Sequence, residues 1–364
     1  MTSRSRVAGM VGLVVAVLAA GRLLTMPEPS STPSPAAVAE TTVADLWPAS
    51  TVVQSPGRLG DGRAYTPWFH LDPSTSVGTA LTGDGSSMRL IVRTGTAERE
   101  LLRLPARDNP QFNGFATTGD DLVFMVSASG DAANTTSVLY RASWKDGAAS
   151  VLTKDTGAVI FFNSQYDVLV RDGRITWAAA GETGQFTEIR SIPMGGGRVT
   201  SQRVDGAYAL SAWPWLTSAG GSQNGAVELR NLTTGERRTV AGQPNELVNC
   251  GPAWCRVMIL GASGQPARTD VMRSDGSDRK RMAAGTISSA VLDVGLLDRF
   301  EVLAQTNRTG TGTLKLMLFD IPSGRSAVLA SGVATVQARG PIVWWSTGEE
   351  EAVEWFALDL RTLS

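Results

Sequence analysis

With 364 residues, the chain is long enough to form one large β domain or two ordinary domains. Its 33 basic and 34 acidic side chains are spread along the sequence and give a net charge of −1, which excludes the basic surface expected of a protein that binds nucleic acid or acidic membranes. Charged residues make up only 18% of the chain, a composition that favours short strands joined by turns over long solvated helices.

The first 25 residues have the pattern of an export signal. Arg4 and Arg6 form a positive segment, and residues 7–20 are an uninterrupted run of apolar and small residues, as in a secretory signal peptide. A membrane span needs about 20 apolar residues, and residues 7–26 reach that length only by including Arg22. Residues 1–25 are therefore expected to be a cleaved signal peptide or a membrane anchor, so that the protein is exported and either secreted or held at the cytoplasmic membrane by residues 7–26.

Residues 26–44 are expected to form a spacer. The stretch MPEPSSTPSPAAVAE that begins at residue 26 is rich in Pro, Ser and Ala and has no apolar period, which is typical of a flexible or extended linker. Residues 45–364 then remain for a single folded domain.

One hairpin pattern recurs through the folded part of the chain. An alternating strand, a tight turn with Gly and a second strand appear around Gly95, Gly147, Gly196, Gly235, Gly276 and Gly324. Asp-Gly and Gly-Gly at such turns supply the positive φ that a two-residue hairpin requires. The spacing of roughly 39 to 52 residues between these glycines matches the length of a four-stranded propeller blade. The fold class is therefore predicted to be all-β, a β-propeller.

The end of the chain indicates how the ring is completed. After PIVWWSTG the sequence VEWFALDLRTLS stops where a further strand of the last unit should begin. A strand from the stretch ASTVVQSPG, at residues 49–57, could take that place and remove an exposed sheet edge. Six hairpins and one unit completed in this way predict seven blades, with six as the alternative.

The best single repeat resembles a known family. Residues 272–281, MRSDGSDRKR, are similar to the strand, Asp-Gly-Ser turn and Arg-rich strand of TolB-type propeller repeats. The stretches WPWL at residues 213–216, CGPAWC at 250–255, LDRFE at 297–301 and WWSTG at 344–348 resemble bacterial exported TolB-like proteins. The resemblance implies a propeller outside the cytoplasm, and it implies no activity.

Cys250 and Cys255 are the chain's two cysteines, and they flank a Gly-Pro turn. On an exported chain a close pair of this kind is most simply a structural disulfide. A redox-active pair normally has two residues between the sulfurs, whereas this pair has four. A metal site would need further ligands, and His70 is the sole histidine. No metal and no cofactor is predicted.

The sequence has no convincing catalytic set. His70 lies among aromatic and apolar neighbours, as a structural histidine would, and no G-x-S-x-G motif is present. Paired carboxylates for glycoside hydrolysis are the remaining possibility, and the acidic residues on or near predicted strands are Asp120, Asp121, Asp167, Asp172, Asp293, Asp298 and Glu301. Because Asp298, Arg299 and Glu301 interrupt an apolar stretch, these three residues are expected to form a structural ion pair, with a ligand site as the alternative.

Trp213 and Trp215 are the candidate partner-binding residues. They flank Pro214, which removes a ladder donor and predicts a loop or sheet edge, and exposed aromatic rings at a propeller rim are typical of partner contacts. The other tryptophans on predicted strands, such as Trp177, Trp344 and Trp355, are expected to pack between sheets.

Taken together, these features favour a monomeric, non-catalytic scaffold that binds a protein, a peptide or a cell-wall component outside the membrane. The alternatives are a secreted hydrolase of the glycoside type with carboxylates at the propeller axis, and a sensor of a small ligand. Whether the protein is an enzyme stays open, with the absence of activity favoured. Contact with the membrane is expected only through the N-terminal segment, and none with nucleic acid.

Overall fold

The computed structural model describes residues 40–128, 136–219, 225–285, 287–306, 312–349 and 352–364. The chain divides into two compact units, Met1–Glu40 and Thr41–Ser364, and the second unit contains every element described below. The expected signal or anchor and most of the expected spacer lie outside the described residues. No helix in the described part of the chain is long and apolar enough to cross a membrane.

The folded unit begins a few residues before the expected boundary at residue 45. Helix α2 (Val43–Leu46) is capped by Thr42, whose side chain accepts a hydrogen bond from the Asp45 N–H, while the Asp45 carboxylate accepts one from the Thr42 N–H at 2.8 Å. Val43 is buried in a core cluster with Phe300. The last residues assigned to the spacer are therefore part of the folded domain.

Strands make up almost all of this unit, and each strand pairs mainly with its neighbours in sequence. The first sheet contains β2 (Thr66–Asp72), β3 (Thr75–Leu81), β4 (Ser87–Thr94) and β5 (Ala97–Pro105). The second contains β6 (Gln111–Thr118), β7 (Asp121–Ala128), β8 (Thr136–Ser143) and β9 (Ser150–Thr153). The third contains β10 (Ala158–Val159), β11 (Val168–Arg171), β12 (Arg174–Ala180), β13 (Phe186–Pro193) and β14 (Thr200–Asp205).

Three more sheets follow. The fourth contains β15 (Tyr208–Leu210), β16 (Trp215–Ser218), β17 (Val227–Asn231) and β18 (Arg237–Val240). The fifth contains β19 (Glu246–Cys250), β20 (Trp254–Leu260), β21 (Pro266–Arg273) and β22 (Lys280–Ala284). The sixth has seven strands, β1 (Val52–Pro56), β23 (Ile287–Ser289), β24 (Phe300–Thr306), β25 (Leu314–Asp320), β26 (Arg325–Arg339), β27 (Ile342–Thr347) and β28 (Glu354–Asp359). The short 3₁₀ turns are η1 (Ala106–Asp108) and η3 (Leu360–Thr362).

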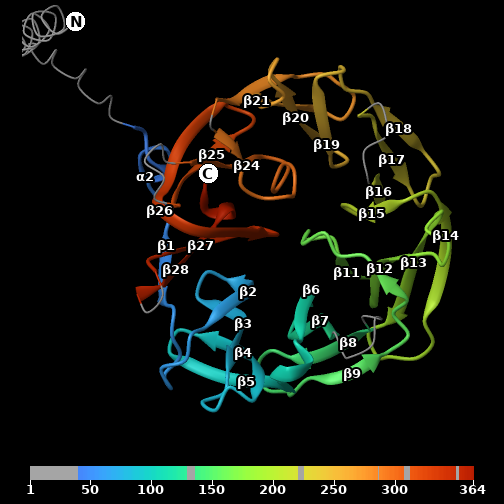
Figure 1. Cartoon of the computed structure of the whole chain (residues 1–364), viewed down its shortest axis with the longest axis vertical. Coiled ribbons are helices and arrows are strands. Elements are labelled where there is room, and N and C mark those ends of the chain that lie inside the picture. The colour runs from blue at the N-terminus through green and yellow to red at the C-terminus, as the bar shows by residue number, and fades with distance from the viewer. Residues whose placement is uncertain (1–39, 129–135, 220–224, 286, 307–311, 350–351) are drawn as a thin grey trace, which may run out of the picture. The chain divides into compact units, whose positions relative to one another are not determined.

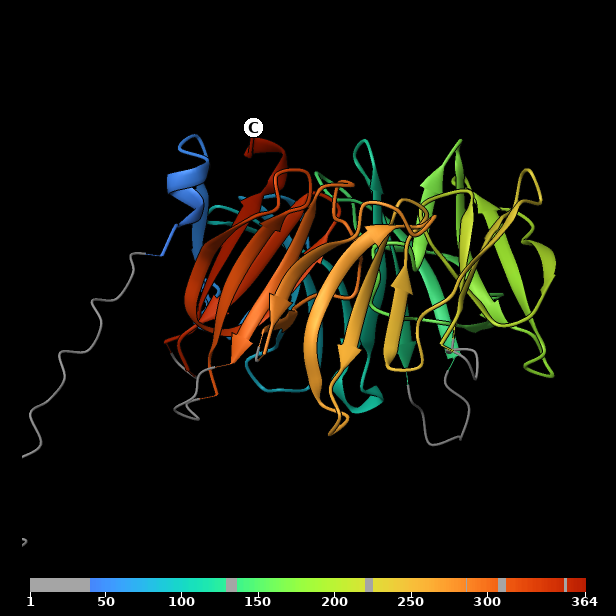
Figure 2. The same cartoon turned by 90° about the horizontal axis from the view of Figure 1, so that it is seen from above.

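All of these strand pairs are antiparallel, as expected for a chain of consecutive hairpins. Figure 1 shows the sheets following one another around a centre, with β2, β6 and β15 toward the centre and β5, β9 and β18 toward the outside. Seen from the side, the strands run between two faces of this arrangement (Figure 2). The turns that join the inner strands of each sheet therefore meet near the centre of the fold.

Five of the six glycine-marked hairpins occupy the same position in their sheets. Each of these connects the third strand of the sheet to the outer strand, as Gly95 does between β4 and β5 and Gly276 between β21 and β22, whereas Gly324 connects β25 to β26, the middle strand of the sixth sheet. The backbone is left-handed, with φ between 57° and 87°, at Gly95, Gly196, Gly235, Gly276 and Gly324, where a side chain would be strained. Gly147 is not among the residues with positive φ, so its turn does not need glycine for that reason.

The sixth sheet joins the two ends of the folded chain. Strand β26 pairs with β25 through its first half and with β27 through its second half. On the other side of β27, the last strand β28 pairs with β1, so that Val53 is opposite Ala357. The N-terminal strand expected from residues 49–57 thus lies beside the last strand of the chain.

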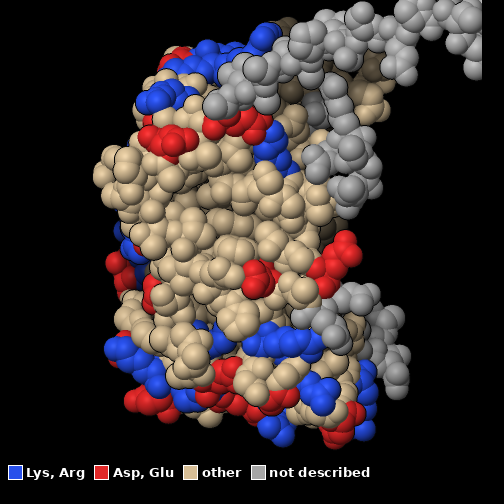
Figure 3. Space-filling model, turned by 90° about the vertical axis from the view of Figure 1, so that its left-hand side faces the viewer, with Lys and Arg blue, Asp and Glu red and all other residues tan. Residues whose placement is uncertain are grey.

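Figure 3 views the side that carries α2, β26, β1 and β28 and shows a broad, mostly uncharged area between two bands of charged residues. The sequence explains this surface, because β26 has no charged residue between Arg325 and Arg339. Charged side chains gather above and below this area in the view of Figure 3.

Aromatic side chains pack between neighbouring sheets. Phe69 of β2 stacks on Phe115 of β6 with ring centroids 5.9 Å apart. Phe115 stacks on Phe124 of β7 at 5.7 Å, and Phe124 on Tyr140 of β8 at 5.5 Å. Such pairs contribute about 1 kcal/mol each beyond the burial of their area. The expected packing of Trp177, Trp344 and Trp355 is confirmed, since all three are less than 9% exposed.

A buried ion pair connects the fifth sheet to the sixth. Arg256 of β20 donates two hydrogen bonds to one carboxylate oxygen of Glu301 in β24, at 2.9 and 2.7 Å, and the other oxygen accepts one from the Gly295 N–H at 2.7 Å. Arg256 also donates to the carbonyl oxygens of Leu292 and Asp293. Because the Glu301 side chain is completely buried, this network fixes the connection between β23 and β24.

We expect Glu301→Gln to lower the free energy of unfolding by about 3 to 5 kcal/mol, because it leaves the guanidinium of Arg256 buried without a counter-charge. Urea denaturation measures the change. Glu100→Gln is the matched control: Glu100 pairs with Arg103 at 2.8 Å on the surface, and removing such a pair costs about 1 kcal/mol or less. Equal losses in the two variants would contradict this account.

Candidate functional site

A cavity of about 300 Å³ is lined by residues of four consecutive sheets, the third to the sixth. Its walls include residues 209–212 at the end of β15, residues 248–254 around the β19–β20 turn and residues 292–294 of the β23–β24 connection. The segment between β10 and β11 adds Phe162, Ser164 and Tyr166. The cavity is thus built by turns that the topology of the inner strands brings together.

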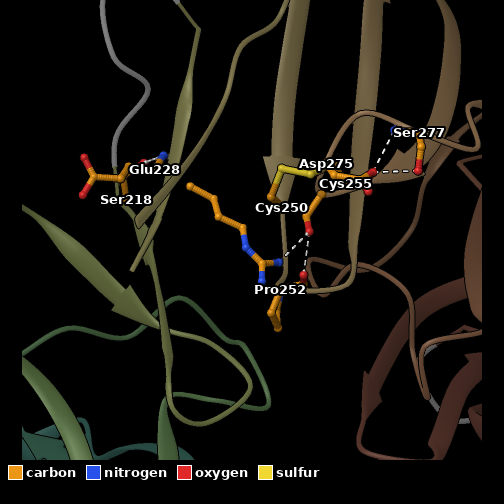
Figure 4. Close-up of a disulfide and its surroundings, with 9 residues drawn as sticks. Ser218, Glu228, Cys250, Pro252, Cys255, Asp275 and Ser277 are labelled. Carbon is orange, nitrogen blue, oxygen red and sulfur yellow. Dashed lines mark hydrogen bonds between the residues drawn. A yellow bond between two sulfur atoms is a disulfide. The ribbon is translucent and has the colours of Figure 1, made fainter. Parts of the chain in front are cut away.

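The disulfide stiffens one wall of the cavity. Cys250 in β19 and Cys255 in β20 are register partners and are bonded to each other, which confirms the expected pairing. Figure 4 shows the bond crossing between the two strands next to Pro252, whose carbonyl oxygen accepts a hydrogen bond from Ser274 at 2.7 Å. The closed loop therefore holds residues 251–254 in one conformation.

Trp254 links this wall to the next one. Its indole N–H donates to the carbonyl oxygen of Asp298 at 2.9 Å, and the ring is only 2% exposed. Gly295 lies so close that a Cβ there would come within 2.9 Å of the Trp254 ring, and its φ of 65° also requires glycine. The turn that carries Asp298 is consequently fixed against the disulfide hairpin.

The lining combines apolar and polar groups. Its larger apolar residues include Phe162, Leu210, Val248, Trp254 and Leu292. The polar groups are the carboxylates of Asp293 and Asp298, the amide of Asn249 and the hydroxyls of Tyr166, Thr217, Ser164, Ser211 and Ser218. A cavity with apolar walls and a few fixed polar groups is typical of a ligand site.

Two buried carboxylates, Asp293 of the lining and Asp167, hold the segment at residues 162–165. Asp167 accepts hydrogen bonds from the N–H groups of Phe162 and Ser164 at 3.1 and 3.2 Å. Asp293 accepts one from the Ser164 hydroxyl at 2.6 Å and one from the Gln165 N–H at 3.0 Å. Since all four carboxylate oxygens are engaged, these acids fix residues 162–165 and are not set up to activate water.

Burial raises the pKa of both acids. For Asp167 it raises the pKa to about 6, against the opposing effect of its hydrogen bonds and of the Arg339 guanidinium. The pKa of Asp293 is raised for the same reason, against its bonds to Ser164 and Gln165. Burial, with the negative charges of Asp293 and Asp298, also raises the pKa of Tyr166, so this phenol stays protonated at neutral pH.

The same segment is tied to two further sheets. Gln165 accepts a hydrogen bond from the Gly340 N–H at 3.1 Å, directly after β26. Arg339, only 8% exposed, donates to the carbonyl oxygen of Phe115 in β6 at 3.0 Å. Polar contacts through residues 162–167 and Arg339 therefore connect sheets that are far apart in the sequence.

His70 is a structural residue, as its setting in the sequence suggests. It is 6% exposed, its ring centroid is 5.1 Å from that of Trp344, and its Nδ1 lies 3.3 Å from the carbonyl oxygen of Asp72. Burial lowers its pKa to about 4. It does not line the cavity, and so it supplies no base there.

The two tryptophans proposed as partner contacts have different surroundings. Trp215 at the start of β16 packs against the cluster around the disulfide, with the guanidinium of Arg238 4.6 Å from its ring centroid. Trp213 is 37% exposed and follows Ala212, which lines the cavity. Pro214, joined to Trp213 by a cis peptide bond, separates them, and of the two only Trp213 is exposed.

The three charged residues near β24 do not pair with one another. Glu301 pairs with Arg256, whereas Arg299, just before the strand, pairs with Asp320 at 2.8 Å. Asp298 has an exposed side chain, has no ion-pair partner among the described residues and lies in a turn with φ of 55°. The expectation of mutual pairing is wrong because the turn at residues 297–298 and the start of the strand direct these side chains apart.

Within the described ranges, no group of three or more His, Cys, Asp or Glu side chains could hold a metal ion. Asp120 and Asp121, considered as acids, form ion pairs with Lys145 and Arg141 at 2.8 Å each. Tyr166, Ser211 and Arg256 have no motif around them that marks them in the sequence. These residues take part in the site through contacts between segments that are distant in sequence, which no short motif records.

No protein-family model matches the sequence, and no curated protein is similar to it in sequence. Solved structures are similar in fold. An uncharacterized protein from Listeria monocytogenes EGD-e has a TM-score of 0.53 and 7% identity over 86% of this chain and 96% of its own. A puromycin-hydrolyzing peptidase from Mycobacterium tuberculosis has a TM-score of 0.51 and 17% identity over 91% of this chain.

The chain spans only 54% of that peptidase. A protein described as a putative TolB from Agrobacterium tumefaciens has a TM-score of 0.42 and 14% identity over 72% of this chain and 93% of its own. At such identities the likeness shows the fold alone. Together with the repeated antiparallel sheets, it supports a β-propeller.

The opposite pKa shifts of His70 and Asp167 give a test by pH. Between about pH 4.5 and 6.5, His70 binds a proton more readily in the unfolded chain, so its contribution to stability rises with pH. Asp167 binds a proton more readily in the folded protein, so its contribution falls with pH over much of this range. Over this pH range each residue changes the free energy of unfolding by about 2 kcal/mol. The two changes have opposite signs and largely cancel.

We therefore expect the free energy of unfolding of Asp167→Asn to rise more steeply with pH over this range than that of the native protein. His70→Gln should show the opposite change of slope. Urea titrations at several pH values measure both. If the three proteins have the same slope, the charge states assigned to these residues are wrong.

Proposed function

We propose that this protein is an exported, non-catalytic β-propeller that binds a protein or peptide partner at the cavity beside the disulfide hairpin. The observation that carries the proposal is the set of exposed apolar side chains at and beside the cavity. Phe162 and Leu292 line it and are 38% and 48% exposed. Trp213, 37% exposed, follows the lining residue Ala212, and Leu297, 45% exposed, precedes the lining residue Asp298.

These four residues come from three segments that are distant in sequence, and they make up half of the eight large apolar side chains exposed in the described ranges. Large apolar groups cost solvation free energy when they face water, and their concentration in one region is typical of a contact surface. Apolar side chains around a cavity suit a partner that inserts one side chain and covers the surrounding surface.

A second groove extends this surface. The walls of this groove include Leu247, which is 55% exposed, Met258, Val291 and Leu292. The groove shares Val248 and Asn249 with the cavity. An extended peptide or a loop of a folded partner could therefore occupy more than one pocket. This arrangement favours a macromolecular partner over a small free ligand.

The alternative of a hydrolase is less well supported. A retaining or inverting glycosidase needs two carboxyl groups, one as the acid and one as the nucleophile or base. Of the two carboxylates in the lining only Asp298 is free, because both oxygens of Asp293 accept hydrogen bonds from Ser164 and Gln165. The similarity to the peptidase covers about half of that protein and does not bring a catalytic set to this chain.

The proposed location outside the cytoplasm is supported by two features. Residues 1–25 have the pattern of a signal or anchor, the cysteine pair forms a disulfide, and such bonds persist mainly in oxidising compartments. The resemblance of residues 272–281 to TolB-type repeats is consistent with that location. A partner in the cell envelope follows from this placement.

We further propose seven blades and a ring closed by β1. The seven-stranded sheet is most simply two blades, β23 to β25 with the first half of β26, and the second half of β26 with β27, β28 and β1. Added to the five other sheets, these make seven.

Ring closure can be tested by cross-linking β1 to β28. Val53→Cys with Ala357→Cys places two thiols on register partners, and oxidation should form a disulfide that closes a loop of about 300 residues and raises the free energy of unfolding by up to about 5 kcal/mol. Val52→Cys with Ala357→Cys directs the thiols to opposite faces and should not cross-link. Cross-linking of the second pair alone would exclude the pairing.

The binding surface can be tested by cross-linking capture from native membranes. The double variant Phe162→Ala, Trp213→Ala should fold normally and recover less than a tenth of the partner that the native protein recovers. Val151→Ala is the matched control, because Val151 is 48% exposed on β9 and does not line the cavity. Equal capture by the double variant and the control would refute the proposed surface, and direct titration with the purified partner would establish the affinity.

A further inference from the structure

The charge of the cavity lining indicates what kind of group it accepts. Two carboxylates, Asp293 and Asp298, belong to the lining, while no Lys, Arg or His side chain does. The free-energy cost of binding in such a site is lowest for a cation, because a neutral or negative ligand would leave the carboxylate charges uncompensated. The apolar walls select further for a cation that has an apolar stem.

Asp298 is the carboxylate that remains available. Asp293 is engaged by Ser164 and Gln165, whereas the Asp298 side chain has no hydrogen bond and no ion pair among the residues described. Its backbone is nevertheless fixed, since its N–H donates to the Gly295 carbonyl oxygen at 2.7 Å and its own carbonyl oxygen accepts from the Trp254 indole. A fixed, unpaired carboxylate at a cavity is a suitable counter-charge.

A second, independent observation also indicates a ligand. Ser211 lines the cavity although only 3% of the residue is exposed, and its hydroxyl forms no hydrogen bond within the described ranges. The hydroxyl is therefore free to bond a group that enters the cavity. The phenol of Tyr166 is likewise unpartnered there, lies in the lining and stays protonated near the charges of Asp293 and Asp298.

We propose that the cavity binds a primary ammonium group at the end of a short apolar chain, as in a lysine side chain of the partner. The inference depends on the proposed function, of which it names the recognised group. The methylene stem would contact Phe162 and Leu292, and the ammonium would face Asp298. Lysine has three donors, and the carboxylate with the hydroxyls of Ser211 and Tyr166 offers acceptors for them.

The test uses N-acetylated, C-amidated tripeptides of sequence Gly-X-Gly with the full-length protein, titrated by calorimetry and ligand-observed NMR. The peptide with X = Lys should bind at least tenfold more tightly than the peptide with X = norleucine, which keeps the stem and lacks the charge. The peptide with X = Glu should bind more weakly still. Equal affinities for lysine and norleucine would overturn the proposal.

Asp298→Asn should weaken the lysine peptide at least fivefold and leave the norleucine peptide unchanged. Asp172→Asn is the matched control: Asp172 also has positive φ, 49°, and it does not belong to the lining. Asn tolerates this backbone conformation as well as Asp does, so both variants should fold. If the two variants bind the lysine peptide equally, Asp298 is not the counter-charge.

Triglycine amide with a free amino terminus distinguishes the source of the ammonium. Binding of this peptide as tight as that of the lysine peptide would assign the site to a chain terminus and overturn the lysine assignment.

Capture of the membrane partner separates this inference from the proposed function. A partner lost by the Phe162→Ala, Trp213→Ala variant and retained fully by Asp298→Asn would leave the function intact and refute the recognition of lysine. Loss with both variants supports both proposals, and capture unaffected by either refutes both.

Discussion

The ion pair between Arg256 and Glu301 determines the shape of the site, because it holds the connection between β23 and β24 in place. That connection is long, and it carries both carboxylates of the cavity. Arg256 binds the carbonyl oxygens of Leu292 and Asp293, while Glu301 binds the Gly295 N–H. A buried pair of this kind contributes little net stability by itself. Its effect is to select one conformation of a segment that has no regular structure, and the positions of Asp293 and Asp298 follow from that conformation.

The segment at residues 162–167 plays a corresponding part on the opposite wall. It interrupts the inner edge of the third sheet between β10 and β11, and its backbone N–H groups would lack partners without Asp167 and Asp293. The carboxylates satisfy these donors, and Gln165 adds a bond to the turn after β26. An irregular segment near the centre is therefore stabilised by buried acids instead of by strand pairing, which explains why their oxygens are engaged and why their pKa values are raised.

Local features of the sequence predicted much of the fold. Gly95 and Gly276 mark the outer hairpin of their sheets, and Cys250 and Cys255 are close enough in sequence for their pairing to be foreseen. The site was much harder to predict. Ser164 and Asp293 are 129 residues apart, and Arg256 and Glu301 come from different sheets, so no short motif records these contacts. The expected pairing of Asp298, Arg299 and Glu301 failed for the same reason: neighbours in sequence found their partners in other segments.

The pairing of β1 with β28 has a consequence for how the protein acquires its structure. Strand β1 is made at the start of the folded unit, and its partner is the last strand of the chain. Until β28 has been made, β1 lacks its partner and offers unpaired N–H and C=O groups to any other extended chain. A polypeptide that lacks residues 354–359 would keep that edge exposed. Such truncated products should aggregate and be degraded more readily than the folded protein.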